Sequence, residues 1–283
     1  MNAMAVWIVV AGLGQMNERF YQDFRPGNLV APSMTPLQIG PSGRILPGSQ
    51  GIQLSLPEKH PANDVIGYSP IFQVGGNFQI TVRYKIVSAG KPEKGMGAGL
   101  KIWGKFAGQK YCAVTLGHFK TPDSDKSLIV SVLGTGQGQD RQFQTQSVPA
   151  SAEHGRLRLV RENNRLTFLF APGDSDSFIE LQSGEVVPEN LTNLRIVATS
   201  HEDPAAVNVQ LLEFEVLADR LAGAQPVVKK RWNWRWIVLP IAVAGAGVGG
   251  FLLWLRHRKS TASAPRRSTG KTTRTMTKGP PRK

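Results

Sequence analysis

The chain has 283 residues, with one Cys, 30 Gly, 19 Pro and 41% hydrophobic residues. This composition excludes a disulfide scaffold, a wholly disordered protein and a polytopic transporter, and the length allows a sizeable core. The net charge of +14 comes from one end, because residues 1–228 carry 20 basic and 20 acidic residues and the excess begins at Lys229. A nucleic-acid-binding domain carries its basic residues on the globular part, so nucleic acid is not expected as a partner.

The amino-terminal segment Ala3–Leu13 is apolar and has the length of a signal-peptide core, with small Gly12 and Gly14 near a possible cleavage point. No Lys or Arg precedes it, and a buried strand is the alternative interpretation. We expect residues 1–15 to be a signal peptide and residues 16–219 to form an exported domain.

The region between Phe20 and Val216 reads as short strands separated by Gly- and Pro-containing turns. Phe78, Ile80, Val82, Tyr84 and Ile86 alternate with polar residues, the pattern of a strand with one buried face. Further strand-like runs begin at Gly51, Ala98, Ser127, Leu157, Leu166, Leu194 and Asn208, and a tight turn is expected at Asn163 and Asn164. About a dozen strands and no amphipathic helix predict an antiparallel sandwich.

Cys112 is the single cysteine, so the exported domain has no internal disulfide. It alternates in phase with Val114 and Leu116, which predicts a buried, small apolar side chain. A reactive thiol or an intermolecular bridge is the alternative.

Five segments together suggest a family: FYQDFR (20–25), GGNFQITVRYKI (75–86), GMGAGLKIW (95–103), GRLRLVRENNRLTFLF (155–170) and VNVQLLEFEV (207–216). They resemble an uncharacterised planctomycete-type domain family, which in turn is similar to the concanavalin A-like lectin and glucanase jelly rolls. The resemblance covers residues 18–217 and implies an all-β antiparallel jelly-roll sandwich. It implies no activity, because the fold alone confers none.

Hydrolysis of a glycan would need two carboxyl groups across a cleft. Glu213 and Glu215 are the best candidates, since residues two apart on a strand point to one face. Solvated charges near the end of the last strand are the alternative, and we favour it. Calcium could bind at Asp123 with Asp125 or at Asp174 with Asp176, but a single pair per loop supplies few of the oxygens that calcium needs. His118, His154 and His201 have no metal or triad spacing. No cofactor or metal is expected.

Sugar binding is suggested by the faces of the expected strands. If Leu100 and Ile102 point to the core, Lys101 and Trp103 point outward, and the same reasoning turns Tyr111 and Arg83 outward. Should these strands be neighbours, two aromatic rings would lie among hydrogen-bonding groups, an arrangement that suits a pyranose ring. A solvated sheet surface with a chance Trp is the alternative.

A transmembrane helix is expected at residues 236–255, because these 20 residues contain no charge and have Trp at both ends. Gly245 and Gly249 are spaced for close helix packing, which makes a helix-mediated homodimer a possibility. The 16 residues of 220–235 would form a juxtamembrane linker. Residues 256–275 carry seven Lys or Arg against five in 216–235, which places the carboxyl end in the cytoplasm.

The tail, residues 256–283, has ten basic residues and no acidic one. It cannot fold alone, and it would be attracted to anionic lipid. The sequence thus predicts a single-pass membrane protein that displays a lectin-like module outside the cytoplasm and binds a glycan or a protein without catalysis. The alternatives are a surface glycoside hydrolase and a structural or assembly protein in which the sandwich is a spacer.

Overall fold

The computed structural model describes residues 16–223 except 109, 125, 138 and 139. This part of the chain forms fifteen strands and no helix, and every strand pair is antiparallel. The predicted all-β antiparallel architecture is confirmed, with a few more strands than expected. The predicted signal peptide, the transmembrane helix with Gly245 and Gly249, and the basic tail lie outside the described residues. Within those residues, no helix is long and apolar enough to span a membrane.

The strands form two layers, the first of which has seven strands. We call this layer the first sheet. Its strands, in spatial order, are β10 (Asp140–Pro149), β9 (Ser127–Gln137), β8 (Tyr111–Lys120), β7 (Ala98–Phe106), β14 (Leu191–Thr199), β5 (Val65–Pro70) and β2 (Met34–Ile39).

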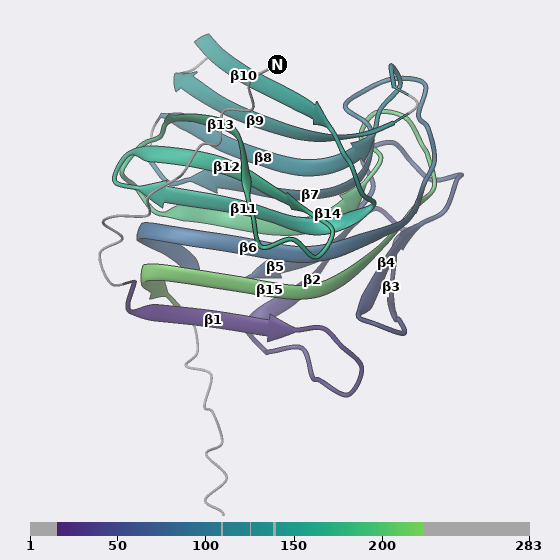
Figure 1. The fold of residues 1–283 in the computed structure, drawn as a ribbon, viewed down its shortest axis with the longest axis horizontal. Helices are drawn as coiled ribbons and strands as arrows, with labels where there is room; N and C mark the ends of the chain where they lie inside the picture. Colours follow the sequence, from purple (N-terminus) through teal and green to yellow (C-terminus); the bar gives the residue numbers. More distant parts are fainter. Residues whose placement is uncertain (1–15, 109, 125, 138–139, 224–283) are drawn as a thin grey trace, which may run out of the picture. The chain divides into compact units, whose positions relative to one another are not determined.

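The second sheet centres on two long strands, β6 (Gln73–Ala89) and β15 (Val207–Ala222), which pair along most of their length. Beyond β6 follow β11 (His154–Glu162), β12 (Arg165–Pro172) and β13 (Ile179–Glu185). The other edge of β15 pairs with β1 (Glu18–Asp23) and β4 (Ile52–Leu56), and β4 pairs with β3 (Arg44–Pro47). In Figure 1, β6, β15 and β1 lie in front of β5 and β2.

A single residue pair, Leu191 of β14 with Val74 of β6, connects the hydrogen bonding of the two sheets. The sheets therefore form a sandwich, and the residues that alternate inward from each build one core. Phe78, Phe106, Phe168 and Phe214 are fully buried there. Cys112 is also fully buried, as its alternation predicted, and burial raises the pKa of its thiol.

Polar residues close one end of the sandwich. The hydroxyl of Ser131 on β9 donates to Oε1 of Gln182 on β13 at 2.8 Å, and Nε2 of Gln182 donates to the carbonyl of Gln144 at 3.3 Å. Ser131 is fully buried, so this bridge satisfies a hydroxyl that would otherwise lack a partner. It ties β13 of the second sheet to β9 and β10 of the first.

Two local features set the register of the strands. Asn163 has φ of 55° in the two-residue turn between β11 and β12, as the sequence predicted for this hairpin. In β14, an extra residue is accommodated between Thr192, which pairs with Lys105, and Arg195, which pairs with Trp103. Asn193 takes φ of 49° within this bulge. The bulge brings Arg195 directly opposite Trp103 on the outward side of the first sheet.

Candidate functional site

Trp103 is half-buried on the outward side of β7, between β14 and β8. The guanidinium carbon of Arg195 lies 4.9 Å from the centre of the indole ring. Thr115 is the partner of Trp103 on the other side, in β8. The aromatic ring thus has an arginine on one flank and a hydroxyl on the other, each contributed by a neighbouring strand.

Lys101 and Lys105 stand two positions before and after Trp103, so all three side chains leave the same side of β7. Nζ of Lys101 donates a hydrogen bond to Nε2 of His201 at 3.1 Å. Burial, with the positive charge of Arg195 nearby, lowers the pKa of Lys101 to about 8. Burial, with the charge of Lys101, lowers the pKa of His201 to about 4, so His201 is neutral at pH 7 and can accept this bond.

We call Lys101, Trp103, Lys105, Thr115 and Arg195 the first-sheet face. The strands that carry it, β7, β8 and β14, contain no Asp or Glu, and neither do β9, β5 and β2. These five residues can therefore donate hydrogen bonds and offer an aromatic surface, but they bring no carboxyl group to act as acid, base or nucleophile.

Tyr111 leaves the same side of the first sheet, four residues along β8 from Thr115, or roughly 13 Å away. The guanidinium carbon of Arg141 is 4.5 Å from the centre of its ring, and Phe143 packs edge-on at 6.2 Å. Tyr111 also lines a pocket of about 470 Å³ with Lys110, Val186 and others. It forms a second aromatic group at the end of the sheet rather than a pair with Trp103.

Arg83 does not lie beside these residues. The sequence had placed it with them because it points outward from its strand. It lies on β6, so it points outward from the second sheet, where it pairs with Asp174 at 2.7 Å and with Glu213 at 3.4 Å. Alternation shows whether a residue points inward or outward, but each sheet of a sandwich has its own outer side. Of the four predicted ligand-binding residues, Lys101, Trp103 and Tyr111 share one side.

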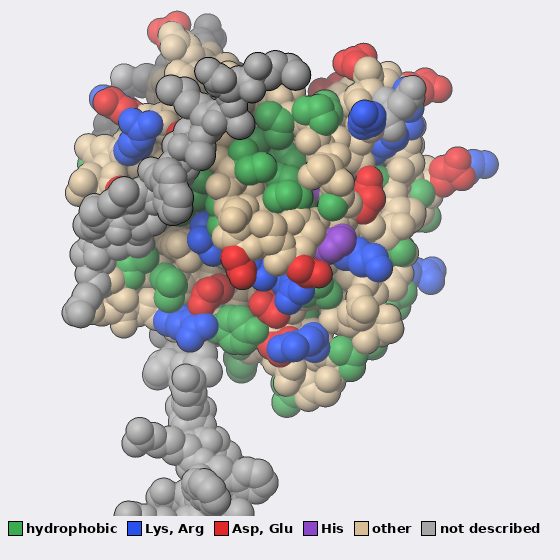
Figure 2. Space-filling model, in the orientation of Figure 1, with side chains coloured by type: hydrophobic (Ala, Val, Ile, Leu, Met, Phe, Trp, Pro, Cys, Tyr) green, Lys and Arg blue, Asp and Glu red, His purple; other side chains and the backbone are tan. Residues whose placement is uncertain are grey.

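Glu213 and Glu215 both line a small hollow of about 140 Å³ on the outer side of the second sheet. Glu213 pairs with Arg83, and Oε1 of Glu215 accepts a hydrogen bond of 2.7 Å from Nε of Arg19. Each carboxylate therefore has a cationic partner. Figure 2 shows acidic and basic side chains interspersed on this front face, around β6 and β15.

Metal ligands do not converge in the described part of the chain, where no group of three or more His, Cys, Asp or Glu could hold an ion. Asp174 forms an ion pair with Arg83, and Asp176 forms an ion pair with Arg156. Asp123 is exposed, and its predicted companion Asp125 lies outside the described residues.

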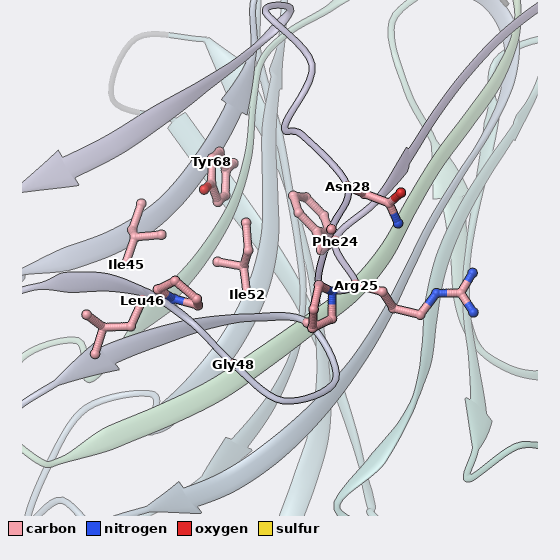
Figure 3. Close-up of a pocket in the computed structure, with 12 residues that line it drawn as sticks. Phe24, Arg25, Asn28, Ile45, Leu46, Gly48, Ile52 and Tyr68 are labelled. Atoms are coloured by element: carbon pink, nitrogen blue, oxygen red, sulfur yellow. The ribbon is translucent and has the colours of Figure 1, made fainter. Parts of the chain in front are cut away.

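An apolar pocket of about 390 Å³ opens beside the turn between β3 and β4. Figure 3 shows Phe24, Ile45, Ile52 and Tyr68 gathered around it, with the side chain of Arg25 directed away. The rings of Phe24 and Tyr68 are 5.5 Å apart. No sequence pattern pointed to this pocket, because its lining comes from the loop after β1, from β3, β4 and β5, and from the turn between β3 and β4.

A family model described as "Protein of unknown function (DUF1583) C domain" matches residues 8–232. The chain belongs to this family. The match confirms membership of an uncharacterised domain family, and the planctomycete character of the resemblance stays a prediction. None of the curated proteins matches the sequence.

The DUF1583 C domain is similar in structure to several lectin-like and sugar-handling proteins, each below 0.5 in TM-score. The legume lectin-like domain from Entamoeba histolytica has 12% identity and a TM-score of 0.48, over 74% of this chain and 99% of that one. The Ca2+/Man3GlcNAc-bound exoplasmic/lumenal domain of VIP36 has 10% identity and a TM-score of 0.48, over 72% and 90%. The Crh5 transglycosylase in complex with NAG has 11% identity and a TM-score of 0.49, over 73% of this chain and 86% of that one. At these scores the likeness says nothing about ligand or chemistry.

Three residues close to Trp103 in the DUF1583 C domain escaped the sequence analysis: Lys105, Arg195 and His201. Arg195 is 92 positions from Trp103 along the chain, and only the pairing of β14 with β7 brings them together. His201 was taken as one of three scattered histidines, yet it holds Lys101. The other two are elsewhere, with His118 buried in the core and His154 on the second sheet.

Proposed function

We propose that this DUF1583 C domain binds carbohydrate without catalysis, through the first-sheet face, and that residues 236–255 anchor it in a membrane with the sandwich outside the cytoplasm. The observation that carries the binding proposal is the half-buried indole of Trp103, flanked by Arg195 and Thr115. A sugar ring presents C–H groups to an aromatic surface and hydroxyls to its surroundings. The first-sheet face supplies both kinds of partner.

The proposal of binding without turnover is supported by the placement of carboxyl groups. Glycoside hydrolysis needs two of them on either side of the scissile bond. The strands around Trp103 contribute none, and Glu213 and Glu215 lie on the other sheet with Arg83 and Arg19 as partners. A glycan held beside Trp103 would be out of reach of both glutamates.

Replacing Trp103 by Ala is expected to weaken glycan binding at least about tenfold, because a central aromatic contact carries much of the binding energy of such a site. The measurement is binding of the purified full-length chain, in detergent, to an immobilised glycan array. Phe178→Ala is the matched control, since Phe178 also has an arginine over its ring, Arg158 at 3.7 Å, but lies by the second sheet. We expect this control to bind like the wild type.

Equal binding by Trp103→Ala and the wild type would contradict the proposal. Release of reducing sugar from a bound glycan, lost in Glu213→Gln, would instead favour the hydrolase alternative. Loss of glycan binding in Phe178→Ala, with binding retained in Trp103→Ala, would place the binding site on the second sheet.

Membrane anchoring makes a separate prediction, which rests on the uncharged run of residues 236–255. Full-length protein in cell membranes is expected to remain in the pellet after washing at alkaline pH with carbonate and to dissolve only with detergent. A chain that ends before Lys229 serves as the control and should be released by the wash. Release of the full-length protein without detergent would refute the anchor.

A further inference from the structure

Three cationic side chains surround Trp103 at close spacing. Lys101 and Lys105 lie on either side of it on β7, each roughly 7 Å away along the strand, and Arg195 lies opposite on β14. Arg195 affects the ionisation of Lys101, which places the two charges within electrostatic reach of each other. The outward side of the first sheet is therefore positively charged around the indole.

These cations differ from four arginines of the second sheet and its edge in having no acidic partner. On the second sheet and its edge, Arg19, Arg25, Arg83 and Arg156 each pair with an Asp or Glu. Within the described ranges, no carboxylate forms an ion pair with Lys101, Lys105 or Arg195. The partner of Lys101 is a neutral imidazole and that of Arg195 is an aromatic ring.

The charge of Lys101 costs stability, because burial and repulsion by Arg195 both disfavour its charged form. The pKa of Lys101, lowered to about 8, reflects both effects. An anionic group brought between Lys101, Lys105 and Arg195 would relieve the repulsion. A neutral sugar would leave the positive charges as they are.

Arg195 is suited to receive such an anion. A guanidinium that stacks on an aromatic ring is already ordered, and its planar edge matches a carboxylate with two parallel hydrogen bonds. The bulge at Asn193 fixes the position of Arg195 in the strand. An arginine in this setting loses less entropy on pairing than a free surface lysine does.

Building on the proposed function, we propose that the ligand is an acidic glycan, whose sugar carboxylate pairs with Arg195 and the flanking lysines while the ring packs beside Trp103. A uronic acid has both features in one residue: the carboxylate and the C–H face. Arg19, Arg83 and Arg156 of the second sheet already pair with carboxylates, so they are less available to such a ligand.

The test measures binding of trigalacturonic acid to the full-length chain by calorimetry, against the same trisaccharide with its carboxyl groups reduced to alcohols. We expect the acid to bind at least about tenfold more tightly than the reduced sugar, and Arg195→Gln to weaken binding of the acid about tenfold. Arg195→Lys keeps the charge but not the paired geometry, and an intermediate loss is expected. Added salt should weaken binding of the acid.

The basic tail requires its own control, since ten cations there could attract an acidic sugar. Arg266→Gln/Arg267→Gln removes two charges from the tail and is expected to change binding less than about twofold. An equal loss in this variant and in Arg195→Gln would overturn the inference. Equal binding of the acidic and the reduced sugar, with both lost in Trp103→Ala, would also overturn it and leave the proposed function intact. Binding unaffected by Trp103→Ala would contradict the proposed function itself.

Discussion

Arg161→Ala is expected to lower the free energy of unfolding by about 3 to 5 kcal/mol. Arg161 is 1% exposed, although it carries a full charge. Its Nε donates to the carbonyl of Gly76 at 2.7 Å, and its Nη1 donates to the carbonyl of Glu189 at 2.6 Å. The alanine would leave both carbonyls without a donor and open a cavity. Urea unfolding followed by circular dichroism measures the loss.

The position of Arg161 explains why so large an effect is expected from one side chain. The guanidinium carbon lies 5.0 Å from the ring of Phe78 on β6 and 5.6 Å from that of Phe106 on β7, so it contacts both sheets. Burial lowers its pKa, yet the carbonyls and the two aromatic faces hold it as a cation. It joins the sheets near the place where hydrogen bonding between them is reduced to Leu191 and Val74.

Arg156→Ala is the matched control, on the outward side of the same strand. Arg156 pairs with Asp176, whose side chain is 90% exposed, and an ion pair of this kind contributes less than about 1 kcal/mol. Arg161→Lys, which reaches fewer carbonyls, should fall between the two. If the free energy of unfolding of Arg161→Ala lies within about 1 kcal/mol of that of the wild type, the hydrogen bonds to the two carbonyls do not stabilise the fold.

The strands that the sequence revealed are those with one buried side. β6, β7 and β15 alternate between core and solvent over much of their length, whereas β9 and β14 are apolar runs with several consecutive buried residues, and both patterns are visible without a structure. β10 was missed because every residue of Asp140–Pro149 is exposed, so the strand has no apolar period. It is held by its hydrogen bonds to β9 instead.

The candidate site was recoverable only in part, for a related reason. Trp103 and Lys101 were found because the alternation of inward and outward side chains along one strand can be deduced from that strand alone. Which strands are neighbours depends on contacts between distant segments, so Arg195 was missed and Arg83 was placed with the wrong sheet. The glutamate pair was located correctly on one side of β15, but its arginine partners lie on β6 and β1 and could not be read from β15 alone.

Stability is expected to fall steeply as the pH drops from about 6.5 to about 4, because two histidines are held neutral in the fold. Burial lowers the pKa of His118 from 6.5 to about 4, and burial beside Lys101 does the same for His201. Within this window the unfolded chain binds more protons than the folded chain, so stability decreases with falling pH. Each histidine contributes about 3 kcal/mol to the loss.

The two histidines resist protonation for different reasons, which makes their contributions separable. His118 is 1% exposed, its Nδ1 shares a 2.8 Å hydrogen bond with the hydroxyl of Tyr84, and its Nε2 has no hydrogen-bond partner. Protonation would create a buried cation, with the carboxylate of Glu153 3.7 Å away. His201 accepts from the ammonium group of Lys101, so its protonation would break that bond and place two cations in contact.

Urea unfolding at pH 7, 5.5 and 4 therefore distinguishes the two. His118→Phe and His201→Asn should each remove about half of the loss between pH 6.5 and pH 4. A combined loss of about 6 kcal/mol is comparable to the whole stability of an ordinary domain, so the wild type should approach unfolding at the acidic end. A flat profile between pH 7 and pH 4 would mean that both rings take up protons in the fold as readily as in water.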